Sequence, residues 1–240
     1  MSDIPPAVTA VGVNFIRNTS VDALSKLERI NMAEITLNDE FGRAIRDTVV
    51  EYQYCTNLEI GSWDGSGSTQ CFIAGMNQID KPKLLQCVEI NNDRFTVMAN
   101  TVKEPYIHQF NMSSVDKNTF LPKSFDDVWL SPYNKISLNY SRELVKSWFD
   151  HDIQHLPDVG FLTKYILLKY DAVLIDGSEF TGYSEYTLLK DNTTCFMLDD
   201  VFTAYKCNQI YHELCNNNAW TLIKSNQTLR NGYAIFIKKS

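Results

Sequence analysis

The stretch LEIGSWDGSG, at residues 58–67, decides the fold class of this chain. An apolar run ends in it, three glycines follow, and helix-forming residues begin at Ser68. This order predicts a strand, a glycine-rich turn and a helix, because glycine lets the backbone take positive φ and lets a ligand approach the main chain. The turn falls at the carboxyl end of the strand, where open α/β sheets bind ligands. Glu59 lies below the turn, and its carboxylate suits a ligand with a cationic group better than a pyrophosphate.

The bulk composition bounds the fold and excludes several classes. The chain has 240 residues, 44% of them hydrophobic, as expected for one large α/β domain with a real core. Its formal net charge of −7 argues against nucleic acid or an anionic membrane as a broad electrostatic partner. No apolar run approaches the ~18 residues that span a bilayer. The first residues show no signal-peptide pattern, and the six cysteines form no Cys-x-x-Cys pair, so we expect a cytoplasmic protein with reduced thiols.

The chain divides into an N-terminal extension, residues 1–56, and a larger region, residues 57–240. In the extension we predict one helix capped by Ser20 and a second capped by Asn38. In the larger region strand and helix patterns alternate, with a pause over about residues 112–168. That segment holds aromatic side chains and prolines. We interpret it as an insertion or lid over the ligand face, or else as a surface elaboration that only packs on the sheet.

The alternating patterns predict a parallel sheet that ends in an antiparallel hairpin. The predicted strands span residues 57–60, 84–90, 106–110, 172–177, 194–200, 220–224 and 233–238. The predicted helices span residues 68–77, 92–103, 161–168, 184–190 and 203–216, with a further helix capped by Ser141.

Acidic residues end several of these strands. Glu89 ends the second strand, where a carboxylate would lie beside the ribose of a nucleoside. Asp176 ends the fourth strand, and Asp199 and Asp200 end the fifth. Clustered carboxylates repel one another unless a cation, a proton or a substrate ammonium compensates, and Mg²⁺ is a natural occupant. The alternative is that each aspartate only caps the following helix.

This arrangement resembles the class I S-adenosylmethionine-dependent methyltransferases, and within them the metal-dependent O-methyltransferases of the catechol and bacterial sugar type. The resemblance covers roughly residues 57–238. It implies a Rossmann-like, doubly wound, seven-stranded α/β sheet in the order 3-2-1-4-5-7-6, with strand seven antiparallel. The residues that carry it are Glu59, Gly61, Gly65, Gly67, Glu89, Asp176 and Gly177, together with the terminal hairpin.

The resemblance also implies a methyl donor and a metal. S-adenosylmethionine would be contacted by Glu59, Gly61, Ser62, Gly65, Gly67, Ser68, Glu89, Ser113 and Asp176. Mg²⁺ or another divalent cation would be bound by Asp176, Asp199 and Asp200. We expect a β-branched residue at position 61 to abolish cofactor binding and to leave the fold largely intact.

The implied catalytic residues are Asp176 and Glu179. Catechol-type enzymes carry a lysine base three residues after the first metal-binding aspartate, and this chain has Glu179 there. A carboxylate could act as the general base or join the metal ligands, and the alternative is a solvated loop acid. Lys206, early in the predicted helix after the fifth strand, is an alternative polar group.

The implied reaction is transfer of a methyl group to a hydroxyl of a small-molecule acceptor. A sugar or other polyol fits the aromatic insertion, and the sequence leaves the oligomeric state open. One alternative is a non-catalytic subunit that binds the cofactor or a partner. Another is an NAD-dependent short-chain dehydrogenase, because the glycine spacing fits that family. Its catalytic serine is missing, however, since Asp152 and Val173 stand where the two Tyr-x-x-x-Lys strings, at residues 165–169 and 186–190, would need it.

Overall fold

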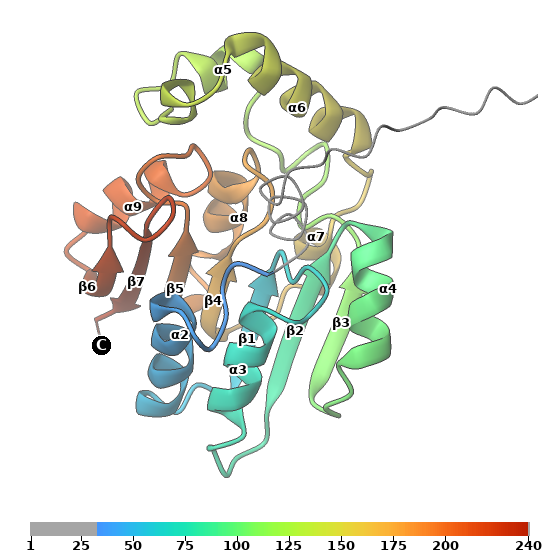
Figure 1. Ribbon diagram of the computed structural model, residues 1–240, viewed down its shortest axis with the longest axis vertical. Helices are drawn as coiled ribbons and strands as arrows, with labels where there is room; N and C mark the ends of the chain where they lie inside the picture. Colours follow the sequence, from blue (N-terminus) through green and yellow to red (C-terminus); the bar gives the residue numbers. More distant parts are fainter. Residues whose placement is uncertain (1–32, 240) are drawn as a thin grey trace, which may run out of the picture. The chain divides into compact units, whose positions relative to one another are not determined.

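A computed structural model of the chain describes residues 33–239, and within them seven strands form one mixed sheet. The strand order is β3-β2-β1-β4-β5-β7-β6, and β7 runs antiparallel to both of its neighbours (Figure 1). The predicted fold class is therefore confirmed. The strands are β1 (Thr56–Ile60), β2 (Leu84–Glu89), β3 (Ile107–Asn111), β4 (Tyr170–Ile175), β5 (Thr193–Asp199), β6 (Trp220–Asn226) and β7 (Tyr233–Lys238).

The central strands are buried on both faces, because helices pack on each side of the sheet. In β4, Val173 and Ile175 belong to one apolar cluster, and Ala172 and Leu174 belong to the other. Alternate side chains of a strand point to opposite faces, so a doubly covered parallel strand is apolar throughout. The helices are α2 (Glu40–Glu51), α3 (Ser68–Met76), α4 (Asn92–Thr101), α5 (Phe125–Trp129), α6 (Arg142–His155), α7 (Phe161–Tyr165), α8 (Gly182–Leu189) and α9 (Asn208–Cys215), with a 3₁₀ turn η1 (Ile136–Leu138).

Helix α2 packs on the sheet. Its cap is Asp39, one residue after the predicted Asn38, because Oδ1 of Asp39 accepts the N–H of Gly42 at 2.9 Å. The Phe41 ring stacks on the Tyr233 ring of β7 with centroids 4.4 Å apart. The compact unit that holds the sheet accordingly begins at Ala33 and includes α2. The helix predicted after Ser20 lies outside the described residues, and the division at residues 56 and 57 stays a prediction.

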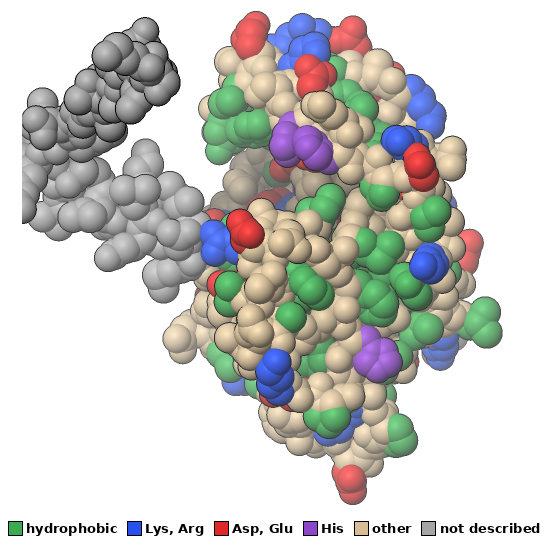
Figure 2. Space-filling model, turned by 90° about the vertical axis from the view of Figure 1, so that its right-hand side faces the viewer, with side chains coloured by type: hydrophobic (Ala, Val, Ile, Leu, Met, Phe, Trp, Pro, Cys, Tyr) green, Lys and Arg blue, Asp and Glu red, His purple; other side chains and the backbone are tan. Residues whose placement is uncertain are grey.

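The insertion between β3 and β4 carries α5, η1, α6 and α7. Figure 1 shows α5 and α6 beyond the carboxyl ends of the parallel strands. The Phe149 ring of α6 meets the Phe180 ring of the β4–α8 loop with centroids 5.3 Å apart, and Ser178 donates a hydrogen bond to Asp152. On the face drawn in Figure 2 the surface is hollowed below the insertion, and acidic and basic side chains are interspersed around it.

The segment after β5 differs from its prediction. A helix was expected over residues 203–216, but α9 begins only at Asn208, and residues 200–207 form a loop. A residue distant in the sequence stabilises this loop, because Glu179 accepts hydrogen bonds from the backbone N–H groups of Tyr205 and Lys206. Among the described residues, the helices are too short and too polar to cross a membrane.

Candidate functional site

Strand register brings the strand-end residues to one edge of the sheet. Ile60 pairs with Ile175 of β4, and Ile175 pairs with Leu198 of β5. The acids that come next in the chain, Asp176 and Asp199, therefore lie at the same height along the sheet. On the other side of β1, Ile60 pairs with Val88 of β2. Because the carboxyl ends of parallel strands lie at the same edge, the glycine turn and the acids of β2, β4 and β5 share it, as predicted.

Gly61 is required by the backbone of the neighbouring strand. It has φ +89°, and a Cβ atom there would lie 2.1 Å from the carbonyl oxygen of Asp176. At Gly65, which has φ +76°, an added Cβ atom would lie 2.7 Å from Cγ2 of Val102. The expectation that a β-branched residue at position 61 leaves the fold largely intact is therefore wrong, because the substitution would push β1 and β4 apart.

Glu59 is fully buried and links β1 to the start of α3. Its two carboxyl oxygens accept hydrogen bonds from the hydroxyls of Ser68 at 2.5 Å and Thr69 at 2.7 Å, and from the Cys87 thiol at 3.4 Å. Burial raises the pKa of Glu59 to about 7, against the lowering effect of these hydrogen bonds. Glu59 thus shapes the glycine turn from below, and its direct contact with a cofactor stays a prediction.

The pKa of Glu59 predicts how stability depends on pH. The folded state holds a proton on Glu59 between the usual pKa of 4.5 and about 7, whereas the unfolded chain has released it. The free energy of unfolding should therefore fall as pH rises through this window, by at most about 3 kcal/mol from this group. Urea denaturation at pH 5 and pH 7 should show a smaller fall for Glu59→Gln than for the wild type. Glu143→Gln, at an exposed position of helix α6, controls for the loss of a carboxylate; an equal fall in all three proteins would contradict the assignment.

Glu89 lies at the end of β2, and two backbone N–H groups fix its carboxylate; its contact with a cofactor stays a prediction. Its Oε2 atom accepts the N–H of Trp63 at 2.8 Å, and its Oε1 atom accepts the N–H of Asn91 at 2.7 Å. A carboxylate offers about four acceptor positions, so these two bonds fix the group and leave acceptor capacity for ligand hydroxyls. Burial raises the pKa of Glu89, and the backbone hydrogen bonds oppose the rise.

The predicted serines have local partners. The Ser62 hydroxyl donates to the carbonyl of Val88 at 3.1 Å, and the Ser113 hydroxyl donates to the carbonyl of Val115 at 2.7 Å. The Ser68 hydroxyl is bound to Glu59. These hydroxyls therefore stabilise the loops around the turn, and their contacts with a cofactor stay predictions.

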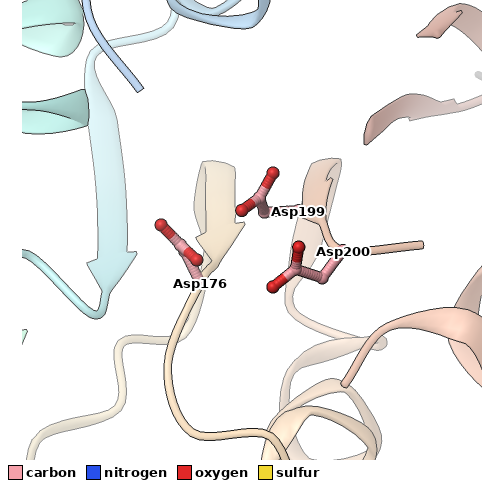
Figure 3. Close-up of side chains that lie close together, drawn as sticks. All are labelled: Asp176, Asp199 and Asp200. Carbon is pink, nitrogen blue, oxygen red and sulfur yellow. The ribbon is translucent and has the colours of Figure 1, made fainter. Parts of the chain in front are cut away.

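Asp176, Asp199 and Asp200 converge at the ends of β4 and β5 (Figure 3). Each offers an oxygen that lies within 4.8 Å of the others. In a continuing strand Asp199 and Asp200 would point to opposite faces of the sheet. Asp200 instead takes φ +55°, a left-handed conformation that aspartate tolerates, and this turn brings both carboxyl groups to the same place. The predicted clustering is confirmed.

A cation of the chain itself lies among these aspartates. Nζ of Lys206 is 2.7 Å from Oδ1 of Asp176 and 2.8 Å from Oδ2 of Asp200, and its side chain is 6% exposed. Nη2 of Arg230, in the turn between β6 and β7, lies 3.7 Å from Oδ1 of Asp199. The sequence offered Lys206 only as an alternative polar group, and nothing in the sequence around Arg230 pointed to its contact with Asp199.

The ionisation of the cluster follows from these contacts. Burial by itself lowers the pKa of Lys206, but the charges of Asp176 and Asp200 outweigh it and hold that pKa above its ordinary range. Burial raises the pKa of Asp176 and, with the charge of Asp176, raises the pKa of Asp199 well above its ordinary range. Burial raises the pKa of Asp200, but the charge and hydrogen bond of Lys206, together with Asn231 and Arg230, outweigh burial and lower that pKa. Within the cluster, the ion pairs with Lys206 thus favour the charged form of Asp200, and burial disfavours that of Asp199.

The contacts of the three aspartates bear on the predicted divalent cation. Three carboxyl groups suit a hard cation in donor type. The ammonium of Lys206, within 2.8 Å of Asp176 and Asp200, opposes a divalent cation there, because it binds the same oxygens and repels a second positive charge. The cluster as built does not fit a divalent metal unless Lys206 moves away.

Glu179 lies in the loop after β4 and binds the backbone of the loop after β5. Its Oε1 atom accepts the backbone N–H of Tyr205 and, at 3.1 Å, that of Lys206. Burial raises the pKa of Glu179, and the nearby Lys206 charge opposes the rise. Glu179 thus fixes the loop that carries Lys206, and its role as general base stays a prediction.

Comparison with known proteins supports the fold. No family model matches the sequence, and no curated protein matches it. An O-methyltransferase from Bacillus cereus in complex with SAH matches with a TM-score of 0.53, 9% identity, and coverage of 95% of this chain and 94% of that chain. TomG from Streptomyces achromogenes, an O-methyltransferase involved in tomaymycin synthesis and solved with SAM, matches with a TM-score of 0.54 and 13% identity. That match covers 92% of this chain and 91% of TomG. A methyltransferase from Geobacter sulfurreducens matches with a TM-score of 0.51 and 10% identity, covering 94% of this chain and 93% of that chain. The chain has the fold of the class I S-adenosylmethionine-dependent O-methyltransferases.

Proposed function

We propose that this protein is an S-adenosylmethionine-dependent O-methyltransferase that acts on a small-molecule hydroxyl. The observation that carries the proposal is the single sheet edge at which the glycine turn, Glu89 and Asp176 meet. Similar solved structures named as O-methyltransferases over nearly the whole chain support it. A non-catalytic binding subunit would share the turn, and turnover with an acceptor is what separates the two.

The donor would be held at the β1 and β2 side of this edge. Glu89 would accept the ribose hydroxyls, since its carboxylate is already oriented by Trp63 and Asn91. The bound donor supplies an electrophilic methyl group on a sulfonium. In-line transfer disperses the sulfonium charge, so the chain contributes mainly alignment of donor and acceptor.

The acceptor would be held at the β4 and β5 side. The Asp176 side chain is 22% exposed and lies next to the glycine turn, so it is placed to accept the hydrogen bond of an acceptor hydroxyl. We propose Asp176 for this role ahead of Glu179, whose Oε1 atom binds the backbone. A saccharide is the first acceptor class to assay, since Tyr140 of the insertion is 47% exposed and pairs edge-on with Trp148 at 5.0 Å.

Replacing Glu89 tests the donor site. Glu89→Ala should weaken the binding of S-adenosylhomocysteine by about 1.5–3 kcal/mol, or roughly 10- to 100-fold, because hydrogen bonds to a charged group are lost. Titration calorimetry measures this directly. Asp93→Ala removes an exposed carboxylate from the first turn of α4 and should leave the affinity unchanged.

The same calorimetry discriminates the alternatives. Binding of NADH in place of S-adenosylhomocysteine would favour the dehydrogenase, and wild-type affinity in a folded Glu89→Ala variant would remove the donor site from this edge. A cytoplasmic location and the absence of nucleic-acid and membrane partners stay predictions from the sequence, whereas the predicted divalent metal conflicts with the position of Lys206.

A further inference from the structure

The ammonium of Lys206 sits where a bound cation would have to sit. Its Nζ atom makes ion pairs of 2.7 Å and 2.8 Å with carboxylates from two different strand ends, Asp176 and Asp200. The third carboxyl group, that of Asp199, is 7% exposed and lies near Arg230 on its other side. Two basic side chains of the chain thus face the three acids. Without such compensation, three carboxylates this close could not all stay ionised.

Lys206 is fixed in this place by its own backbone. Glu179 accepts the N–H groups of Tyr205 and Lys206. The carbonyl oxygen of Lys206 packs so closely on Gly182 that a Cβ atom there would lie 2.3 Å away. For a divalent ion to take the aspartates, the ammonium would have to leave a buried pair. An uncompensated buried charge is strongly unfavourable.

We propose that Lys206 is the resident cation of this carboxylate cluster and takes the place of a divalent metal. The cation-binding part of this inference rests on the ion pairs alone. Its consequence, that methyl transfer proceeds here without a metal on these aspartates, rests on the proposed function. The three aspartates then keep the geometry of a cation site, and a single lysine decides which cation fills it.

Removing the lysine charge should open the site to metal. Lys206→Met keeps an unbranched side chain and removes the ammonium. Electron paramagnetic resonance of added Mn²⁺ should show no stoichiometric binding to the wild type and at least about tenfold tighter binding to Lys206→Met, since the repulsion of a unit charge a few ångströms away is lost. Mg²⁺ should raise the melting temperature of this variant alone. Asp200→Asn in the Lys206→Met background should abolish both effects.

Matched controls separate the site from general charge effects. Lys206→Arg keeps the positive charge and should not bind Mn²⁺. Lys117→Met removes a surface lysine that pairs with Asp158 at 2.7 Å, and it should not bind Mn²⁺ either. Binding of Mn²⁺ to the wild type that Asp200→Asn removes would overturn the proposal, as would a folded Lys206→Met that gains no affinity. If Lys206→Met does not fold, Mn²⁺ binding is measured on the wild type and on Lys206→Arg. Stoichiometric Mn²⁺ binding by either protein overturns the proposal.

The readout also distinguishes this inference from the proposed function. Calorimetry with S-adenosylhomocysteine on the same proteins reports the donor site, whereas Mn²⁺ reports only the aspartates. Failure of the wild type to bind S-adenosylhomocysteine would remove the proposed function and leave the result on Lys206 standing.

Discussion

Gly61→Ala is expected to cost about 3–5 kcal/mol in the free energy of unfolding. A left-handed φ of +89° costs a residue with a side chain about 1–2 kcal/mol. The new Cβ atom would also lie 2.1 Å from the carbonyl oxygen of Asp176 and 2.5 Å from its carbonyl carbon. Relief requires β1 and β4 to separate where the N–H of Asp176 donates to the carbonyl of Ile60 at 3.0 Å. The total stability of a domain is about 5–15 kcal/mol, so part of the variant could fail to fold.

Urea denaturation followed by circular dichroism measures the loss. Gly177→Ala is the matched control at the same edge, because a Cβ atom there would meet only side-chain atoms, the nearest being Cγ2 of Ile60 at 3.1 Å. That control should cost about 1 kcal/mol, at the lower end of the overpacking range, because side chains can shift by the few tenths of an ångström required. Equal stabilities of the two variants would mean that β1 and β4 do not approach as closely as the structure has them.

Gly182→Val is expected to cost about 3 kcal/mol or more and to displace Lys206. The Cβ atom would lie 2.3 Å from the carbonyl oxygen of Lys206 and 3.1 Å from its carbonyl carbon. Backbone at that distance cannot rotate away, so the loop before α9 must move. Overpacking typically costs 1–3 kcal/mol, and a β-branched side chain against a carbonyl lies at the upper end.

Thr187→Val tests whether a β-branched apolar residue in α8 is harmful in itself. Thr187 already has the same shape and lies in the same helix, so its replacement should cost no more than about 1 kcal/mol. If Gly182→Val folds, its affinity for Mn²⁺ should rise as it does in Lys206→Met, because the ammonium is moved off the aspartates. A Gly182→Val protein as stable as Thr187→Val would mean that Gly182 does not hold the loop.

The sheet and the edge at which its acids gather could be predicted from local sequence pattern. Apolar runs broken by glycine and capping residues predicted the strands, and the terminal hairpin predicted the antiparallel strand. Glu89, Asp176 and Asp199 could be placed together because each ends a strand, and parallel strands end at one edge. Such inferences need only local pattern and topology. The helix expected from residue 203 failed because the contact that holds residues 205 and 206 as a loop comes from Glu179, outside that segment.

The orientation and partners of the site residues depend on tertiary contacts. A left-handed φ at Asp200 turns its carboxyl toward Asp176, and strand alternation alone predicts the opposite face. Complete burial makes Glu59 a link between β1 and α3, and the close approach of Asp176 accounts for Gly61. Lys206 lies 30 residues from Asp176 along the chain and reaches it only through the packing of a loop. The cation at a carboxylate cluster is set by which side chain the fold brings there, and that depends on long-range contacts which local sequence pattern does not encode.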